Sequence, residues 1–337
     1  MKFQPDFFRT ETREGFEIPE MMKRAWAAEL EVLEVIKQVC QKNGIRYYAC
    51  YGTLLGAVRH NGFIPWDDDI DICMLRKDYD RFMEIADDEL PKGFAVSGIY
   101  AKEPRLWEAN SEPQGRVIAD EACFPLAAYM DYFHSYPYPR IGIDIFPLDY
   151  YPADITKQYE LVSICYNLQL FASEVSKYRA DGTLQRRLDE YSCFFGNLDA
   201  RDLDDVTLRH RIRYVSDRIA ASTEAAKAEG VADVLYSRSA KSIEEYQKII
   251  GMREEWFGGG TEHIFEQGYV HVPNNPEAVL CSQFGEDYMI PKMFSAEHGY
   301  PFYGSQEEAF TKLLRESGVT SSVDEFCRNW HAMNGGT

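Results

Sequence analysis

Residues 45–72 contain the feature that most restricts what this chain can fold into. A β-branched and aromatic run over residues 45–51 predicts a strand, and it ends at Gly52 and Thr53. A short helix is predicted directly after it, over Leu54–Arg59, with Thr53 capping its N-terminus. Four aspartates then lead into an alternation with apolar residues. This order of strand, glycine turn, helix and acidic strand predicts a mixed sheet with helices against it.

The acidic segment, if extended, places alternate side chains on opposite faces. In an extended chain Asp67, Asp69 and Asp71 point to one side, while Asp68 points to the other. Carboxylates this close repel one another, so at neutral pH they share protons or bind a cation. Their hard oxygen atoms suit Mg²⁺, Mn²⁺ or Ca²⁺ better than zinc or copper. We therefore expect a divalent-metal site here.

Two other interpretations of the acidic segment can be weighed on its spacing. An EF-hand calcium loop counted from Asp67 needs glycine at the sixth position and glutamate at the twelfth, where the chain has Ile72 and Asp78. That spacing excludes the calcium loop. A solvated acidic loop is the second alternative, since runs of charge are usually exposed faces. Ile70 and Ile72 argue against it, because they alternate with the acids.

The glycine–threonine turn would present backbone N–H groups at the start of a helix. A phosphate is favoured there by the helix dipole and by amide donors that have no carbonyl partner in the helix. Arg59 adds a fork of donors for phosphate oxygens. Alone such a turn indicates little, because glycine before a helix is common. Its significance comes from the aspartates that follow it.

At these residues the chain resembles the LicD family of phosphotransferases, which is related to the fukutin-type ribitol-phosphate transferases and to the wider nucleotidyltransferase fold. The longest matching block is Tyr51–Phe82, and shorter ones are Gly142–Asp149 and, more loosely, Phe284–His298. The resemblance implies a nucleotidyltransferase-like core that moves a phosphorylated alcohol, such as phosphocholine from CDP-choline, onto a sugar hydroxyl. The acceptor would be a glycan or a lipid-linked sugar, as in the modification of a cell-surface polysaccharide.

The resemblance carries over to individual residues. Gly52 and Thr53 match the Gly-Ser/Thr turn of the fold. Asp69 and Asp71 match its metal-binding acid pair, and Asp144 would be the third acid. The pair is expected to hold a Mg²⁺ (or Mn²⁺) ion that bridges the phosphates of a CDP-alcohol donor. Asp144 is expected to ligate a second ion and to orient or deprotonate the acceptor hydroxyl.

Other residues receive expected roles around this centre. Asp67 shares the face of the metal-binding acids and is expected to ligate the ion or support its ligands, whereas Asp68 is expected to be structural. His298 would contact phosphate or acceptor, or lie on the surface. A choline group would need aromatic rings around its quaternary ammonium. Trp66 and the tyrosine-rich run over residues 129–138 are candidates, with packing in the core as the alternative for each.

Composition restricts the partners and the compartment. The chain has 36 Lys and Arg against 55 Asp and Glu, a net charge of −19, and no strongly basic segment. Binding to nucleic acid is therefore not expected. No apolar stretch reaches the roughly 18 residues that span a bilayer, and the first twelve residues lack the apolar core of a secretory signal. We expect a cytoplasmic protein without a transmembrane segment, whose contact with a membrane, if any, is peripheral.

The cysteine pattern indicates reduced thiols. Eight cysteines are scattered without any C-x-x-C pair, mostly in apolar surroundings, which is not typical of a disulfide framework. A zinc site from His263, His271 and Cys281 is conceivable, but the spacing fits no recognised ligand pattern.

The chain is predicted to be an α+β protein: a nucleotidyltransferase-like catalytic core over residues 1–150, and a mainly helical part over residues 151–337 that covers the core and shapes the acceptor site. In the first part, helices are predicted over Pro19–Asn43 and Asp78–Leu90, and further strands over Phe94–Ile99 and Ile141–Phe146. In the second, helical stretches are predicted around Thr156–Arg179, Thr183–Phe195, Asp205–Glu229 and Ser242–Trp256.

Three functions are compatible with these residues. The first is the phosphotransferase, which releases CMP. The second keeps the same core but transfers a nucleoside monophosphate and releases pyrophosphate. The third is a non-catalytic module stabilised by a metal. Asp69, Asp71 and Asp144, together with the glycine–threonine turn, argue against the third, because a degenerate relative would be free to lose them.

Overall fold

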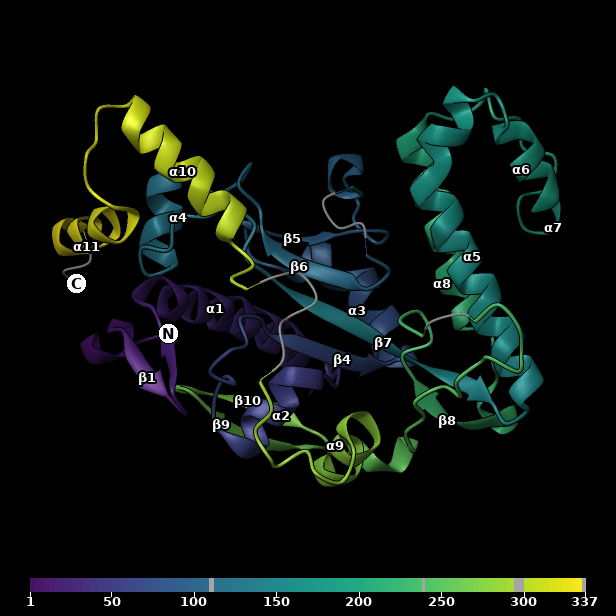
Figure 1. The fold of residues 1–337 in the computed structure, drawn as a ribbon, viewed down its shortest axis with the longest axis horizontal. Helices are drawn as coiled ribbons and strands as arrows, with labels where there is room; N and C mark the ends of the chain where they lie inside the picture. Colours follow the sequence, from purple (N-terminus) through teal and green to yellow (C-terminus); the bar gives the residue numbers. More distant parts are fainter. Residues whose placement is uncertain (109–111, 238–239, 294–299, 335–337) are drawn as a thin grey trace.

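A mixed β-sheet forms the centre of the molecule. The computed structural model describes residues 1–108, 112–237, 240–293 and 300–334. The strands of the central sheet are β3 (Tyr48–Ala49), β4 (Asp71–Leu75), β5 (Phe94–Ser97), β6 (Gly115–Ala119), β7 (Gly142–Pro152) and β8 (Ala228–Ala232). Within the described residues they form a 6-stranded sheet in the order β3-β4-β7-β6-β5, with β8 pairing to β7 outside this path (Figure 1). The α+β class with a mixed sheet flanked by helices is confirmed.

Strand β7 organises the sheet because it pairs with three neighbours. Its first half pairs in parallel with β4 and antiparallel with β6, and its last residues pair antiparallel with β8. The predicted strand over Ile141–Phe146 is therefore right in place but too short, since β7 runs on to Pro152. The strand reaches from the acidic segment at one end to the start of the helical part at the other.

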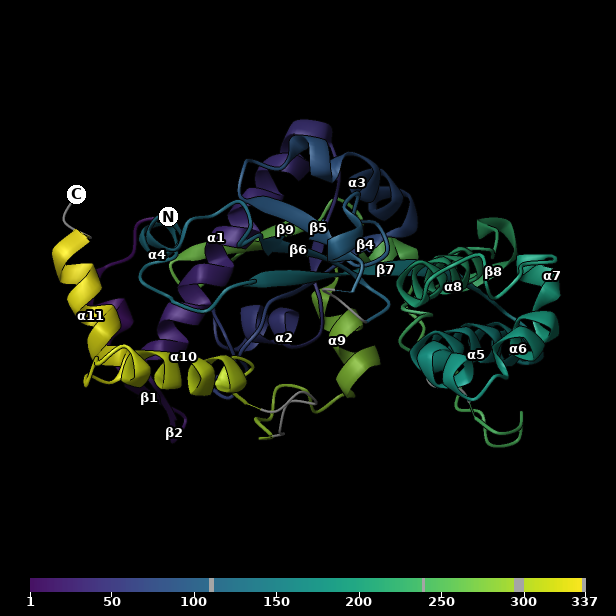
Figure 2. The same cartoon turned by 90° about the horizontal axis from the view of Figure 1, so that it is seen from above.

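Three helices cover the half of the sheet that carries the acidic segment: α1 (Glu20–Asn43), α2 (Tyr51–Arg59) and α3 (Arg76–Glu89). Helix α1 ends at Gly44, which takes the left-handed conformation that favours glycine, as the sequence predicts. Its Trp26 stacks on Phe63 at 4.4 Å between ring centroids. Helices α1 and α3 contact each other and the sheet, while α2 lies on the opposite side of the sheet from α3 (Figure 2).

A helical arm follows directly after β7. It consists of α5 (Ile155–Ala180), α6 (Leu184–Glu190), α7 (Ser192–Phe195) and α8 (Asp205–Ala220), and it stands to one side of the sheet (Figure 1). The arm has an apolar cluster of its own, which includes Phe171, Leu188 and Ile212. A buried ion-pair network joins it to the core: Arg76 of α3 donates from Nε to Asp149 of β7 at 2.6 Å and from Nη1 to Asp217 of α8 at 3.0 Å.

The remaining elements come from several parts of the chain, and some of the C-terminal ones pack on the core. The other described elements are η1 (Pro5–Phe8), β1 (Glu11–Arg13), β2 (Phe16–Ile18), η2 (Pro104–Leu106), α4 (Leu126–Tyr132), η3 (Ala225–Lys227), η4 (Glu254–Trp256), β9 (Thr261–Phe265), β10 (Gly268–Val272), α9 (Pro276–Phe284), α10 (Gly304–Glu316) and α11 (Val323–Asn334). Phe265, Leu280 and Leu314 belong to the same buried cluster as the sheet. Residues 151–337 thus supply both an arm and elements that share the main core. The division at residue 150 stays a prediction.

Two helix predictions in the second half are wrong in part or in whole. The stretch Asp205–Glu229 is helical only as far as Ala220, because residues 228–232 pair with β7 as strand β8. The stretch Ser242–Trp256 forms turns and the short helix η4. Met252 in this stretch exchanges backbone hydrogen bonds with Val231, each 2.8 Å long. Tyr246 and Ile249 of this stretch are buried in a cluster with residues of α5 and β8. The spacing of apolar residues alone does not distinguish such an irregular segment from a helix.

The capping role predicted for Thr53 is also wrong. Helix α2 starts at Tyr51, with Cys50 as the N-cap residue, so Thr53 lies inside the first turn. Its buried hydroxyl instead accepts a hydrogen bond from the backbone N–H of Asp71, at 2.8 Å. Thr53 therefore ties the start of the helix to the start of the acidic strand.

All eight cysteines are free. His263 and His271 lie at neighbouring register positions on β9 and β10, opposite Val270 and Glu262 respectively, so their side chains point to opposite faces of this ribbon. A zinc ion cannot bind both of them, and that alternative is wrong. In the described part of the chain, none of the helices combines the length and apolar character needed to cross a membrane.

Candidate active site

The acidic segment enters β4 as a compact group of carboxylates. Asp67, Asp68 and Asp69 each offer one oxygen atom, and these three atoms lie within 4.8 Å of one another. Asp68 is fully buried while Asp67 and Asp69 are partly exposed. The predicted parity is wrong for the carboxylate of Asp68, because this segment precedes β4 and the oxygen atom of Asp68 lies with those of its two neighbours. Asp68 accepts a hydrogen bond from the backbone N–H of Phe302 at 2.6 Å. Asp68 therefore anchors the C-terminal segment, in line with the expected structural role, and also contributes an oxygen to the group.

Asp71 and Asp144 occupy opposite positions on the parallel strands β4 and β7. Burial raises the pKa of Asp71 well above its ordinary value, and the negative charges of Asp69, Asp144 and Asp67 raise it further. Asp69, Asp144 and Asp67 therefore each lie close enough to Asp71 for their charges to act on it. The structure thus brings together the four acids that the sequence proposes as metal ligands.

Gly52 lies directly against this group. A Cβ atom at position 52 would come 2.1 Å from Oδ2 of Asp67, so only glycine leaves room for that carboxylate. The backbone N–H of Leu54 donates to the carbonyl of Cys50 at 3.1 Å, and this is the first hydrogen bond of the helix. The amides of residues 51–53 come before it in the chain and belong to the helix N-terminus. The start of α2 and the acids face the same small volume. A contact between this turn and a donor phosphate stays a prediction.

Two residues that the sequence analysis missed hold Asp144 in place. Arg116 of β6 donates from Nη1 to Oδ1 of Asp144 at 3.0 Å, and Gln114 donates from Nε2 to Oδ2 at 3.1 Å. Arg116 is the register partner of Asp144 on β6 and also donates to the carbonyl of Gly142 at 3.2 Å. A single arginine inside an apolar strand, Gly115–Ala119, was the signal that could have found it.

Glu29 of α1 is a further missed carboxylate. Its side chain is 1% exposed, and burial raises its pKa well above the ordinary value, with the charges of Asp69 and Asp68 adding to the shift. Among the described residues its Oε2 atom has no hydrogen-bond partner. A glutamate in the apolar stripe of α1, three residues after Trp26 and four before Leu33, was the sequence signal for it.

The acids and Glu29 fit a hard divalent cation. The donor set consists of carboxylate oxygens, and both Asp71 and Glu29 carry raised pKa values because negative charge accumulates around them. Within the described residues, Arg116 is the cation that the structure pairs directly with Asp144. A bound cation would relieve the repulsion between carboxylates that lie this close together.

An aromatic edge borders the acids. Tyr51 donates its phenolic O–H to Oδ2 of Asp233 at 2.9 Å, and burial raises the pKa of Asp233 to about 7. The ring of Phe146 packs edge-on against the rings of both Tyr51 and Tyr236, each at 5.1 Å between ring centroids. Tyr236 is 45% exposed, and the charges of Glu112, Asp144 and Asp71 add to burial in raising the pKa of its phenol. Sequence reasoning missed Asp233 and Tyr236, which lie far from the acids along the chain.

The structure gives the following contacts for the other predicted site residues that it describes. Arg59 is at the opposite end of α2 from Gly52, and its guanidinium donates to the backbone carbonyl of Tyr288 at 2.8 Å. Trp66 is partly buried and packs edge-on against Phe16 at 6.4 Å. His298 lies outside the described residues. In the tyrosine-rich run Tyr129, Phe133, Tyr136 and Tyr138 are buried in the main core, so the packing alternative holds for these four, whereas Tyr132 is 39% exposed.

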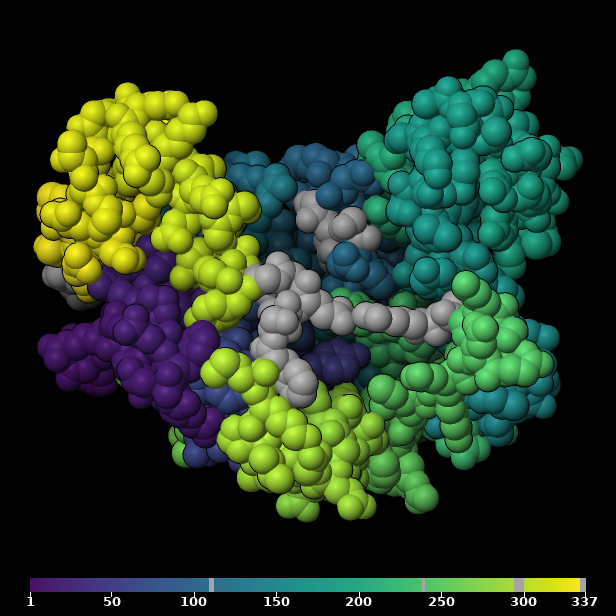
Figure 3. Space-filling view, in the orientation of Figure 1, coloured from purple at the N-terminus to yellow at the C-terminus, as the bar shows by residue number. Residues whose placement is uncertain are grey.

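The face that Figure 3 presents is hollowed between its outer parts. Figure 3 shows the face hollowed between the helical arm, the C-terminal helices α10 and α11, and the segment around α9. Strands β4 and β7, which carry Asp71 and Asp144, run through the middle of the molecule between these parts (Figure 1).

Comparison with known proteins adds an independent finding. Residues 44–159 match the family described as LicD/FKTN/FKRP, nucleotidyltransferase domain. The chain is 48% identical over 56 residues, 17% of its length and 21% of the relative's, to the lipopolysaccharide cholinephosphotransferase LicD of Haemophilus influenzae. It is 31% identical over 121 residues, 36% of its length and 34% of the relative's, to an uncharacterized protein of Rickettsia typhi. The matched segments thus span between a fifth and about a third of these relatives' length.

Proposed function

Residues 44–159 carry a nucleotidyltransferase domain of the LicD family, and on that premise we propose that this chain is a metal-dependent phosphotransferase that moves phosphocholine from CDP-choline to a sugar hydroxyl. The acceptor would belong to a glycan or glycolipid precursor, and CMP would be released. The name of the Haemophilus influenzae relative, a lipopolysaccharide cholinephosphotransferase, supports both the transferred group and the class of acceptor.

The observation that carries the proposal is the meeting of Asp71 and Asp144 at opposite register positions, beside Asp67, Asp69 and Gly52. A donor with two phosphates brings negative charge into a group of carboxylates, and that repulsion disfavours binding without a cation. Asp69 and Asp71, with Asp67 beside them, would hold Mg²⁺ or Mn²⁺, which when bound would neutralise the donor's phosphates and stabilise the departing CMP.

The residues of this chain supply orientation and proton transfer. In the proposed reaction the acceptor oxygen forms a bond to the phosphorus that carries choline, while the bond from that phosphorus to the bridging oxygen breaks and CMP leaves. The acceptor's proton passes to a carboxylate oxygen of Asp144. Arg116 and Gln114 fix the orientation of that carboxylate through their hydrogen bonds at 3.0 and 3.1 Å. The amides at the start of α2 would receive phosphate oxygens of the donor.

For the choline group, Tyr236 is the aromatic ring that this arrangement favours. A quaternary ammonium donates no hydrogen bonds and gains most from the face of an aromatic ring and from nearby negative charge. Tyr236 is 45% exposed, rests against Phe146 at 5.1 Å, and lies close enough to Asp144 and Asp71 for their charges to raise its pKa.

A donor experiment tests the proposed function. The purified chain is incubated with CDP-choline or CDP-ribitol and Mg²⁺, with and without lipid-linked glycans, and the nucleotide products are separated. We expect CMP from CDP-choline, faster with an acceptor than without. Pyrophosphate released from a nucleoside triphosphate would instead indicate transfer of a nucleoside monophosphate, and no turnover of any nucleotide would indicate a binding module.

A further inference from the structure

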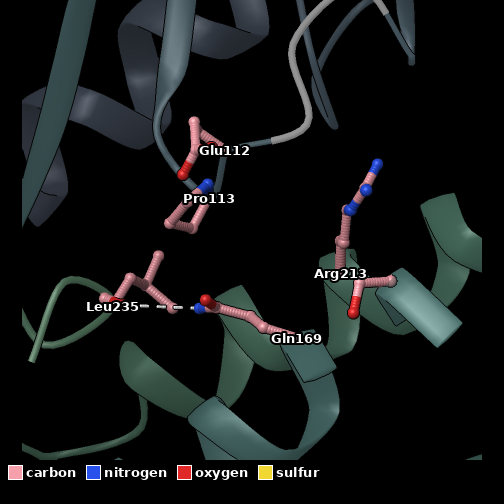
Figure 4. A pocket seen from close by; sticks show the side chains of 6 residues that line it. Glu112, Pro113, Gln169, Arg213 and Leu235 are labelled. Atoms are coloured by element: carbon pink, nitrogen blue, oxygen red, sulfur yellow. Dashed lines mark hydrogen bonds between the residues drawn. The ribbon is translucent and has the colours of Figure 1, made fainter. Parts of the chain in front are cut away.

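A separate pocket lies between the helical arm and the catalytic sheet. It has a volume of about 190 Å³ and is lined by Glu112, Pro113, Gln169, Ser173, Arg213 and Leu235. In Figure 4, Glu112 and Pro113 of the segment before β6 lie across an open space from Gln169 of α5 and Arg213 of α8. The volume is below the roughly 300–1,000 Å³ of typical drug-sized ligand sites, so it has room for one small unit.

The lining offers both donors and acceptors to a ligand. Gln169 and Ser173 are four residues apart on α5 and share one face of the helix. The amide of Gln169 donates to the carbonyl of Leu235 at 3.4 Å, and the hydroxyl of Ser173 donates to the carbonyl of Leu170 at 2.8 Å. Both groups keep further capacity, because an amide has two N–H groups and an acceptor oxygen and a hydroxyl has two lone pairs.

The charges around the pocket favour a neutral ligand. The guanidinium of Arg213 is 11% exposed and pairs with Glu108 at 3.3 Å. The carboxylate of Glu112 also lies close enough to Arg213 to oppose the lowering of its pKa by burial. Glu108 also pairs with Arg209 at 2.9 Å, so two arginines and two glutamates lie together beside the pocket. A phosphate would find little net attraction here, whereas a ligand rich in hydroxyl groups can use the amide, hydroxyl and carboxylate together.

The pocket adjoins the candidate active site through one residue. Leu235 lines the pocket, and the next residue, Tyr236, has its ring against Phe146 at 5.1 Å. Besides burial, the charge of Glu112 in the pocket and the charges of Asp144 and Asp71 in the active site raise the pKa of the Tyr236 phenol. A ligand seated in this pocket would therefore lie beside Tyr236, whose ring packs against Phe146 of β7, the strand that carries Asp144.

We propose that this pocket binds one sugar ring of the acceptor, held by the amide of Gln169 and the hydroxyl of Ser173 on α5 and by Glu112 on the core. The inference rests on the proposed function, since it assigns the acceptor of that same reaction. It gives the helical arm a role in acceptor recognition, with the attacking hydroxyl directed past Tyr236 towards Asp144.

Saturation-transfer NMR on the full chain tests the pocket directly. The probes are the methyl glycosides of glucose, galactose, N-acetylglucosamine and N-acetylgalactosamine, each titrated against the wild-type protein and the double variant Gln169→Ala/Ser173→Ala. We expect the wild type to bind at least one of them, and the double variant to bind that glycoside about tenfold more weakly, as the loss of two neutral hydrogen bonds implies.

The chain offers a matched control at another place. Gln306 of α10 donates to the carbonyl of Pro139 at 3.0 Å, and Ser282 of α9 donates to the carbonyl of Val279 at 2.9 Å, so the variant Gln306→Ala/Ser282→Ala removes the same two kinds of group outside the pocket. It should bind the glycoside like the wild type. Equal binding by wild type and the Gln169→Ala/Ser173→Ala variant, or no binding of any probe by the wild type, would overturn the inference. Release of CMP from CDP-choline by the wild type without any sugar tests the proposed function separately, so the two can fail independently.

Discussion

The carboxylate of Asp67 lies where a side chain at position 52 would begin, because a Cβ on Gly52 would come 2.1 Å from its Oδ2 atom. The contact joins the start of α2 to the acidic segment. It places backbone amides that favour anions beside carboxylates that favour a cation, which is the combination that a metal-bound phosphate donor requires.

Gly52→Ala tests this contact. We expect turnover to fall about 100-fold, because a displacement of catalytic groups by about 1 Å is enough for such a loss, while the far-ultraviolet circular dichroism stays that of the wild type. Gly304→Ala is the matched control, since Gly304 lies in the first turn of α10 and an added Cβ there meets nothing within 4 Å. Wild-type turnover by Gly52→Ala would show that the position of Asp67 does not matter.

Arg116→Gln tests the balance of charge around Asp144. Removing the guanidinium leaves Asp144, Asp71 and Glu29 with less compensation, and we expect the free energy of unfolding in urea to fall by about 2 kcal/mol. Added Mg²⁺ should restore part of that loss, because it binds the folded chain and offsets the same charges. Arg201→Gln removes an exposed arginine paired with Asp199 and should leave stability unchanged. A variant whose stability does not respond to Mg²⁺ would contradict the metal site.

Asp233 should make stability depend on pH. Burial raises its folded-state pKa from 3.8 to about 7, so the folded chain holds a proton that the unfolded chain releases at lower pH. The stability from this proton is fully present below pH 3.8 and is lost as the pH rises towards 7. Asp233→Asn, which keeps an acceptor for the Tyr51 hydroxyl, should therefore gain about 2–3 kcal/mol relative to wild type between pH 5 and pH 8. Urea unfolding at both pH values measures this gain.

Asp202→Asn serves as the control for that measurement, because Asp202 is exposed and its charge stays in water. Its stability difference from wild type should be the same at both pH values. A constant difference for Asp233→Asn as well would show that Asp233 is charged in the folded chain throughout this range.

Tyr236 should distinguish choline from a polyol. In Tyr236→Leu we expect the KM for CDP-choline to rise about tenfold, since the ring face that attracts the quaternary ammonium is lost, while the KM for CDP-ribitol changes little. Tyr236→Phe keeps the ring and should resemble the wild type with CDP-choline. Equal effects of Tyr236→Leu on both donors would exclude a specific contact with choline.

The parts of this fold that the sequence could predict are those set by local pattern. The sequence predicts a helix over Pro19–Asn43, and α1 spans Glu20–Asn43, because its apolar stripe and its terminal Gly44 are both contained in the segment itself. The stretch Ser242–Trp256 was predicted as a helix and is irregular, because the backbone of Met252 is engaged by Val231 of β8, a partner that local periodicity does not reveal.

The candidate site divides in the same way. Asp67, Asp68 and Asp69 are close because they are neighbours in the chain, just before β4 begins at Asp71. Arg116 and Glu29 join them from β6 and α1, and only the pairing of β6 with β7 and the packing of α1 bring them there. Local pattern does not identify Asp144 as a site residue, whereas the family resemblance does. Its position opposite Asp71 depends on the parallel pairing of two strands that lie more than 70 residues apart in the chain.

The rate of CMP release from CDP-choline is the measurement that tests the central claim most directly, taken for the wild type with Mg²⁺, for the wild type with excess chelator, and for Asp69→Asn with Mg²⁺. The arrangement of Asp67, Asp69, Asp71 and Asp144 predicts CMP release by the first, and a rate lower by at least about 100-fold for the other two. Release at the wild-type rate by Asp69→Asn, or by the wild type in excess chelator, would contradict a metal-dependent transfer at these carboxylates.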